Sequence, residues 1–207
     1  MKKKVIGLID GQSGNIGSIN KAIKDIIKGR PYQLKIIKSD FNYSSFDKII
    51  LPGQGAYATL MSNLKKLKII KPLKKYLENN SSYLGICVGM QILSSLGYEN
   101  ETSEGLSLIA GKVQKLDTNE NLPHVGWNSL NFKNTNKIFK DISNKTDFYF
   151  THSYCFELND NSCEISSTNY GVKFSSAINK NNIYGTQFHP EKSQSAGIKL
   201  IKNFLEI

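Results

Sequence analysis

Short apolar runs alternate with segments of helical spacing over the first hundred residues. The β-branched runs have the length of buried strands, whereas isoleucines between positions 16 and 27 recur every three or four residues, as on one face of a helix. Strands that alternate with helices favour βαβ units and a parallel sheet. The pattern predicts strands at Val5–Ile9, Leu34–Ile37, Lys48–Leu51 and Tyr83–Ile86, and helices at 16–27, Ala58–Leu64, Pro72–Leu77 and Val88–Ser95.

After about Ser107 strand patterns dominate, separated by Asn-rich turns, and a last helix is predicted at Ser193–Phe204. No linker or repeat divides the chain, so we expect a single domain over residues 1–207. Its predicted class is α/β, with helices flanking a parallel core sheet and an antiparallel extension in the second half. The strands predicted there are Lys112–Leu116, Asn128–Phe132, Phe148–Tyr154, Glu164–Ser167, Lys173–Ile178 and Ile183–Gln187.

The composition narrows the setting in which this domain works. A hydrophobic content of 39% over 207 residues supports a packed core and is too high for a disordered chain. No apolar run approaches the roughly 20 residues that span a bilayer. The basic start is followed by a short apolar run that stops at Asp10, which indicates a strand and not a signal peptide. Three cysteines, an odd number, favour a reducing compartment, so we expect a cytoplasmic protein.

The charge is the unusual feature of the composition. Lys and Arg total 27 against 17 for Asp and Glu, which gives a formal net charge of +10. Such a charge suits a polyanionic or acidic protein partner. However, Arg30 is the single arginine. Arginine is the residue that usually recognises phosphates and bases through bidentate hydrogen bonds. We therefore expect no nucleic-acid binding and interpret the charge as a compositional bias.

The segment Gly85-Ile86-Cys87-Val88-Gly89 is the cysteine form of the G-x-S-x-G nucleophile elbow. In such an elbow a buried strand turns sharply into a helix and leaves the nucleophile at the tip. The flanking glycines let strand and helix pack closely. The N–H of Val88 would then point at a developing oxyanion. The alternative is that Cys87 is a small buried hydrophobic residue, as most free cysteines are. We expect Cys155 and Cys163, which lack such glycines, to be structural.

His189 is the best candidate for the acid and base that a thiol nucleophile needs. It follows an apolar strand, is stiffened by Pro190, and has the carboxylate of Glu191 two residues further on. A carboxylate in that position fixes the imidazole tautomer and stabilises the imidazolium. His124 and His152 have no carboxylate within a few residues, so we expect them to be structural or to line a surface site.

The segment Gly53-Gln54-Gly55 follows a strand at the same sheet edge as Cys87, where parallel sheets bind ligands. Two glycines around one residue allow the backbone to approach a ligand or a peptide to flip. Gly53 or Gln54 is therefore expected to supply a second oxyanion N–H, although an ordinary tight turn is the alternative. Gln91 lies one helical turn beyond Cys87 and is expected to line the pocket.

These segments together resemble the triad-type (class I) glutamine amidotransferases, whose fold is flavodoxin-like. Within them, the finer resemblance is to the glutaminase subunits of imidazole glycerol phosphate synthase, and it covers essentially the whole chain. The motifs that carry it are Pro52–Gly55, Gly85–Gln91, Ser103–Leu106, Pro123–Asn128, Tyr149–Tyr154 and Phe188–Gly197.

The resemblance implies that Cys87 attacks the side-chain amide of L-glutamine, that His189 passes a proton to the leaving ammonia, and that Glu191 orients His189. A glutamyl thioester is then hydrolysed to glutamate without a metal or organic cofactor. The resemblance implies a heterodimer in which ammonia passes to a separate (β/α)₈-barrel cyclase subunit of histidine biosynthesis. It assigns substrate and oxyanion contacts to Gly53, Gln54, Gly55, Val88, Gln91, His152 and Ser153, and the partner face to Trp127, Tyr149 and Lys192.

The chain departs from the family pattern in two places. The family usually has Asp-Tyr-Gly-Met-Gly-Asn after its first strand, whereas this chain has Asp10-Gly11-Gln12-Ser13-Gly14-Asn15. Gln54 stands where an apolar residue, commonly Val, is expected. The acceptor of the ammonia therefore stays open, and a surface-sugar amidotransferase system is the alternative to the histidine pathway. A stand-alone cysteine hydrolase and a non-catalytic binding protein are more distant alternatives.

Overall fold

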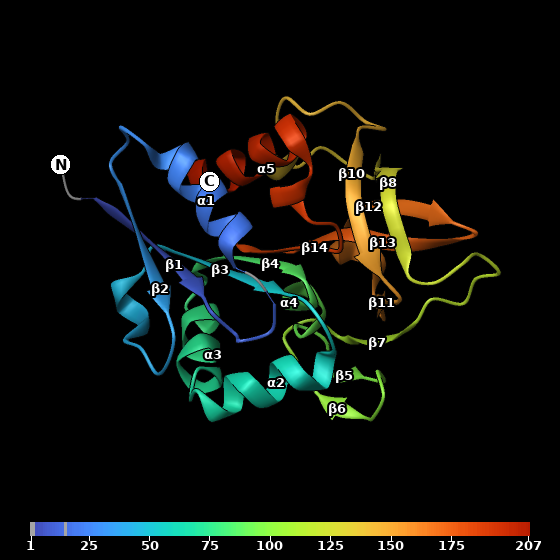
Figure 1. Cartoon of the computed structure of the whole chain (residues 1–207), viewed down its shortest axis with the longest axis horizontal. Coiled ribbons are helices and arrows are strands. Elements are labelled where there is room, and N and C mark those ends of the chain that lie inside the picture. The colour runs from blue at the N-terminus through green and yellow to red at the C-terminus, as the bar shows by residue number, and fades with distance from the viewer. Residues whose placement is uncertain (1–2, 15) are drawn as a thin grey trace.

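The computed structural model describes residues 3–14 and 16–207, and its centre is a mixed eight-stranded sheet (Figure 1). Five neighbouring strands run parallel, in an order typical of the flavodoxin-like fold, and the extension beyond them is antiparallel. The predicted fold class is confirmed. The strands in spatial order are β2 (Tyr32–Ile37), β1 (Lys4–Ile9), β3 (Lys48–Gly53), β4 (Ser82–Cys87), β14 (Ile183–Thr186), β13 (Val172–Lys180), β12 (Glu164–Tyr170) and β9 (Asn131–Phe132).

Helices cover both faces of the parallel part of the sheet. Figure 1 shows α1 (Gly17–Ile27) and α5 (Gln194–Glu206) on one face, and α2 (Tyr57–Lys66) and α3 (Ile70–Glu78) on the other. Their apolar residues at helical spacing pack against strands that are apolar on both sides, as a doubly covered parallel sheet requires. None of the helices among the described residues has the length and apolar character needed to cross a membrane.

Two smaller sheets stand at the end of the molecule where the parallel strands terminate (Figure 1). One is a ribbon of β8 (His124–Ser129) and β10 (Asp147–His152), which pair antiparallel. The other has four strands in the order β11 (Tyr154–Leu158), β7 (Gly111–Lys115), β5 (Leu96–Gly97) and β6 (Ser103–Glu104). Short 3₁₀ turns complete the fold at Tyr43–Ser45, Lys137–Phe139, Asn161–Cys163 and Pro190–Lys192.

Two strands predicted as continuous are each divided between sheets. The predicted strand Asn128–Phe132 is broken at Leu130, and Phe148–Tyr154 is broken at Ser153. At the second break the chain leaves the β8–β10 ribbon and joins the four-stranded sheet, where the Ser153 carbonyl accepts a hydrogen bond from Leu116 N–H. Apolar alternation cannot show such a change of partner, because both halves keep the same period.

The predicted helix Val88–Ser95 is wrong in length, since α4 spans only Val88–Gln91. The carbonyl groups of Ile92 and Leu93 do not continue the helix. The Ile92 carbonyl accepts a hydrogen bond from Leu106 N–H. The Leu93 carbonyl accepts hydrogen bonds from Leu108 and Ile109 N–H, so a later loop supplies the donors that further helical turns would have supplied. The tertiary partners of these carbonyls therefore end the helix after one turn.

Glycines at the start of α4 allow β3, β4 and this turn to approach closely. A Cβ atom on Gly89 would lie 1.9 Å from the carbonyl oxygen of Leu51, and one on Gly85 would lie 2.3 Å from the carbonyl oxygen of Gly89. Neither position has room for a side chain. The elbow thus exists because backbone packs directly on backbone.

Gly89→Ala should destabilise the fold by about 3 kcal/mol or more, because its methyl group would overlap the Leu51 carbonyl. The matched control is Gly29→Asn. Gly29 has a φ of +73° and open space around it, and asparagine tolerates that conformation. Urea unfolding of the two variants measures the difference, and equal midpoints would show that the close approach is unimportant.

Candidate active site

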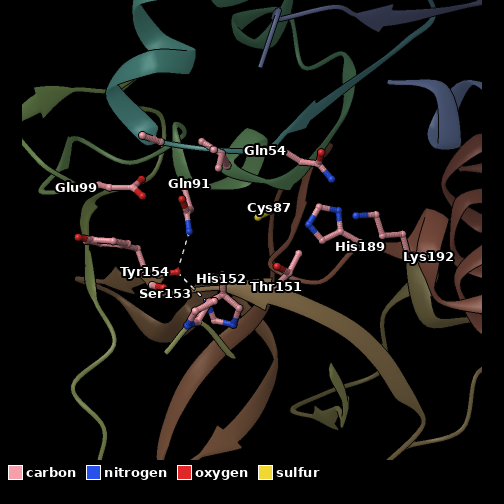
Figure 2. Close-up of a pocket in the computed structure, with 14 residues that line it drawn as sticks. Gln54, Cys87, Gln91, Glu99, Thr151, His152, Ser153, Tyr154, His189 and Lys192 are labelled. Atoms are coloured by element: carbon pink, nitrogen blue, oxygen red, sulfur yellow. Dashed lines mark hydrogen bonds between the residues drawn. The ribbon is translucent and has the colours of Figure 1, made fainter. Parts of the chain in front are cut away.

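The predicted chemistry converges where β3, β4 and β14 end. Gly53 pairs in register with Cys87, and β14 continues through Gln187 and Phe188 into His189. A pocket of about 430 Å³ opens at this edge (Figure 2). It is lined by Gln54, Gly55, Ala56, Cys87, Val88, Gln91, Glu99, Pro123, Thr151, His152, Ser153, Tyr154, His189 and Lys192. The structure therefore brings the predicted thiol, imidazole and loop together.

Cys87 has the strained backbone of a nucleophile elbow. Its φ is +53° and its ψ is −112°, a conformation that non-glycine residues rarely adopt. The residue is 4% exposed, and Figure 2 shows its sulfur at the inner wall of the pocket. Because α4 has only four residues, a helix dipole acts on the sulfur through one turn at most. The immediate neighbours of the sulfur therefore matter more than the helix does.

His189 and Glu191 form a buried pair beside this sulfur. The Nδ1 atom of His189 lies 2.8 Å from Oε1 of Glu191, and the two side chains are 2% and 5% exposed. Burial lowers the pKa of His189, but interactions with Cys87 and with the Glu191 carboxylate outweigh it and raise the pKa to about 10. Among the described residues the Nε2 atom has no hydrogen-bond partner of good geometry, and His189 itself lines the pocket.

Ser193 locks the His-Pro-Glu turn against β10. Its hydroxyl donates to the carbonyl of His189 at 2.6 Å and accepts the N–H of Tyr149 at 3.0 Å. The N–H of His189 in turn donates to the Tyr149 carbonyl at 2.9 Å. From the sequence we singled out Ser193 only as part of a motif, because its hydrogen bonds depend on a strand more than forty positions away.

The loop after β3 borders the pocket beside His189 (Figure 2), but one of its two predicted oxyanion donors is engaged elsewhere. The N–H of Gln54 donates to the carbonyl of Ser13 at 3.0 Å. Gly14 allows this contact: its φ is +100°, and a Cβ atom there would lie 2.6 Å from Cβ of Gln54. The two departures from the family pattern therefore touch each other. Asn15, the last residue of that segment, lies outside the described residues.

The opposite wall is formed by the break between β10 and β11. Thr151, His152, Ser153 and Tyr154 line the pocket there, and Gln91 bridges from α4. The Nε2 atom of Gln91 donates to the carbonyl of Tyr154 at 2.9 Å and to Oε1 of Gln187 at 3.0 Å. His152, Ser153 and Gln91 were predicted in the pocket, and the structure places them there.

Sequence reasoning missed three polar residues at this wall: Glu99, Thr151 and Gln187. Glu99 is the single carboxylate among the residues that line the pocket, and its Oε2 atom also accepts the N–H of Tyr57 at 2.8 Å. Gln187 lies beneath the wall, fully buried, beside the Cys87 sulfur. No local signal marks Glu99, which lies in an irregular loop, whereas Gln187 stands next to the His-Pro-Glu motif.

His124 and His152 form a buried neutral pair behind the pocket. Asn128 Nδ2 donates to Nε2 of His124 at 3.4 Å, His124 Nδ1 lies 3.1 Å from His152 Nε2, and His152 Nδ1 lies 3.0 Å from the Tyr154 carbonyl. The carbonyl can only accept, so each ring carries its proton on Nδ1. Burial lowers the pKa of His124 to about 4 and that of His152 to about 3.

The three residues predicted to face a partner gather on the outer side of the β8–β10 ribbon. Trp127 is 48% exposed and its ring centroid lies 6.1 Å from that of Tyr149. The ammonium group of Lys192 lies 5.9 Å from the Tyr149 ring centroid, and Lys192 also lines the pocket (Figure 2). Exposed tryptophans are typical of binding surfaces, and the contacts of Tyr149 connect this one to Lys192 at the pocket. Among the described residues, no cluster of three or more His, Cys, Asp or Glu side chains is arranged to hold a metal ion.

Comparison with known proteins assigns this site to a family. Residues 14–207 match the family model described as glutamine amidotransferase class-I. The imidazole glycerol phosphate synthase subunit HisH of Methanocaldococcus jannaschii is 42% identical, over 98% of this chain and 100% of the relative. The corresponding subunit of Pelagibacter ubique is 40% identical over 98% and 99%. The chain belongs to the class-I glutamine amidotransferases. The predicted resemblance, to this family and to these synthase subunits within it, is confirmed.

Solved structures show the same amidotransferase fold at lower identity. A chain of the Thermotoga maritima PurLQS structure superposes with a TM-score of 0.75 at 17% identity, covering 99% of this chain and 98% of that one. A glutamine amidotransferase from the same organism gives a TM-score of 0.72 at 14% identity, covering 100% and 97%. At this identity the likeness concerns the fold.

The three histidines of this amidotransferase should show no titration between pH 5 and 8. His189, with a pKa near 10, stays protonated there, whereas His124 and His152, with pKa values near 4 and 3, stay neutral. Histidine Cε1–H resonances followed by NMR would test this, with His124→Phe and His189→Asn used to assign the signals. A resonance that moves with a midpoint near 6.5 would contradict the environment described for that residue.

Proposed function

We propose that the chain is the glutaminase subunit of an imidazole glycerol phosphate synthase, which hydrolyses L-glutamine to glutamate and ammonia. The observation that carries the proposal is the set Cys87, His189 and Glu191 at one pocket, with the His189–Glu191 contact of 2.8 Å. A strained cysteine, an adjacent imidazole and a carboxylate that orients it are the parts of a nucleophilic acyl transfer. The family membership supplies the substrate.

The reaction proceeds in two acyl-transfer steps. His189 is already protonated in the resting site, so the Cys87 thiolate attacks the side-chain amide carbon of glutamine and forms a tetrahedral oxyanion. His189 gives its proton to the amide nitrogen, the C–N bond breaks, and ammonia leaves a γ-glutamyl thioester. A water molecule, deprotonated by His189, attacks that thioester, and the C–S bond breaks to give glutamate and the Cys87 thiolate, with His189 protonated again. Glu191 keeps the imidazole oriented throughout.

The pocket suits a small zwitterion. A volume of about 430 Å³ lies within the range of small-ligand sites. We propose that the Glu99 carboxylate binds the α-ammonium group of glutamine and that Gln91, His152 and Ser153 contact the rest of the amino acid. With the amide carbon at Cys87, the charged end then points toward the loop that carries Glu99.

The oxyanion is proposed to be bound by Val88 N–H together with a backbone N–H of the Gly53-Gln54-Gly55 loop. In the structure the Gln54 N–H is bonded to the Ser13 carbonyl, so this peptide has to reorient before it can stabilise an oxyanion. One missing oxyanion donor lowers turnover by about 10²–10³-fold. The isolated chain is therefore proposed to be a slow glutaminase.

A partner subunit is proposed to provide the signal for that rearrangement. The exposed face formed by Trp127, Tyr149 and Lys192 lies next to the pocket mouth, which suits the passage of ammonia to a (β/α)₈-barrel cyclase in a heterodimer. A cytoplasmic location, a single domain over residues 1–207 and the absence of a cofactor remain part of this proposal. So does the choice of histidine biosynthesis over surface-sugar synthesis.

Purified chain should release glutamate slowly from glutamine and at least about 10²-fold faster when a histidine-pathway cyclase is added. Cys87→Ala should abolish the stimulated release, because no thioester can form, whereas Cys163→Ala should retain it. A coupled glutamate dehydrogenase assay measures both. Full stimulated release from Cys87→Ala would refute the mechanism, and stimulation by a sugar-modifying synthase in place of the cyclase would reassign the acceptor.

A further inference from the structure

We propose that Gln187 is a positioning residue for the nucleophile: its side-chain amide donates a hydrogen bond to the Cys87 sulfur and holds it in the orientation for attack. The inference rests on the proposed cysteine mechanism and adds to it a residue outside the triad. Gln187 lies between the end of β14 and His189, and its side chain is completely buried. Its Nε2 atom lies 3.6 Å from the Cys87 sulfur, within the range of an N–H···S hydrogen bond.

The orientation of the Gln187 amide is fixed by its other end. Its Oε1 atom accepts a hydrogen bond from Nε2 of Gln91 at 3.0 Å. A primary amide is planar, with its acceptor oxygen and its NH₂ group on opposite sides of the amide carbon, so a hydrogen bond to the oxygen directs the NH₂ group toward the sulfur. The backbone N–H of Gln187 also donates to the Ser176 carbonyl at 2.9 Å, which anchors the residue to β13.

Gln91 is itself held by the pocket wall. Its Nε2 atom donates to the Tyr154 carbonyl at 2.9 Å, and the same carbonyl lies 3.0 Å from His152 Nδ1 (dashed lines in Figure 2). A continuous chain of hydrogen bonds therefore runs from His152 through Tyr154, Gln91 and Gln187 to the sulfur. Because every donor in that chain is neutral, it fixes geometry without offering a proton that would compete with His189.

The Gln187 amide donor offsets the cost of burying a thiolate at Cys87. The sulfur is buried, and a buried thiolate is costly unless polar groups face it. His189 supplies one such group on the pocket side, and Gln187 supplies a second, uncharged one from beneath. With both in place the thiolate is stabilised and its rotation about χ1 is restricted.

Gln187→Glu tests the proposal because it is nearly isosteric and keeps an acceptor for Gln91, but in its ionised form it cannot donate to the sulfur. The experiment uses the full chain with Cys155→Ala and Cys163→Ala, so that Cys87 is the remaining cysteine. Iodoacetamide alkylation of Cys87 is followed from pH 5 to 10. The pH of half-maximal rate should rise by at least about one unit, and the rate at pH 6 should fall about tenfold.

Gln33→Glu in the same background is the matched control, since Gln33 is exposed on the edge strand β2 and its alkylation profile should equal the parent's. Gln187→Met removes the donor without placing a negative charge beside the sulfur, so it is measured in parallel and separates loss of the hydrogen bond from charge repulsion. Its profile should shift in the same direction. A folded variant with the parental profile would overturn the role of Gln187.

The two proposals fail in different ways. Alkylation requires neither glutamine nor a partner, so a parent chain that is alkylated normally but does not hydrolyse glutamine would contradict the proposed function alone. A parent that hydrolyses glutamine beside a Gln187→Glu variant with unchanged alkylation and unchanged kcat would contradict the positioning role alone.

Discussion

The close approach of the turn after β4 to strand β3 determines the geometry of the whole pocket. Gly89 lies against the Leu51 carbonyl, and Gly53 pairs in register with Cys87, so that the elbow and the loop after β3 share one edge. Next to that contact the chain turns at Cys87 with a positive φ. The strain is retained because the strands on both sides are buried in the sheet.

The three histidines differ in protonation state because their environments differ. His189 faces a carboxylate and a thiol, and it is held as a cation although it is buried. His124 and His152 are buried among Phe150, Tyr170 and Phe174 with only neutral hydrogen-bond partners, and they are held neutral. The charge of His189 also contributes to the lowered pKa of His152, so the cation at the reacting centre helps to keep that imidazole neutral.

The amino-acid sequence was sufficient to locate a site residue wherever the contacts that define its role are local in the chain. Cys87 stands between two glycines at a strand end, and His189 has its carboxylate two residues away, so both could be located by spacing alone. The contacts that could not be predicted depend on pairing between distant strands: Gln187, which was missed, reaches Cys87 across the β14–β4 register, and the Ser193 hydroxyl reaches β10. The breaks at Leu130 and Ser153 have the same cause, because a change of sheet leaves the apolar period intact.

The shared acceptor in the pocket wall is a main-chain atom, the carbonyl oxygen of Tyr154. Substitution of the tyrosine side chain would reshape the wall but leave that oxygen in place, since β11 pairing with β7 fixes the backbone. A substitution at position 154 can therefore change the side chain that faces the ligand without breaking the chain of hydrogen bonds that leads to the Cys87 sulfur. Related sequences can therefore vary the side chain at position 154, and with it the shape of the pocket, while the main-chain oxygen that accepts from Gln91 is kept.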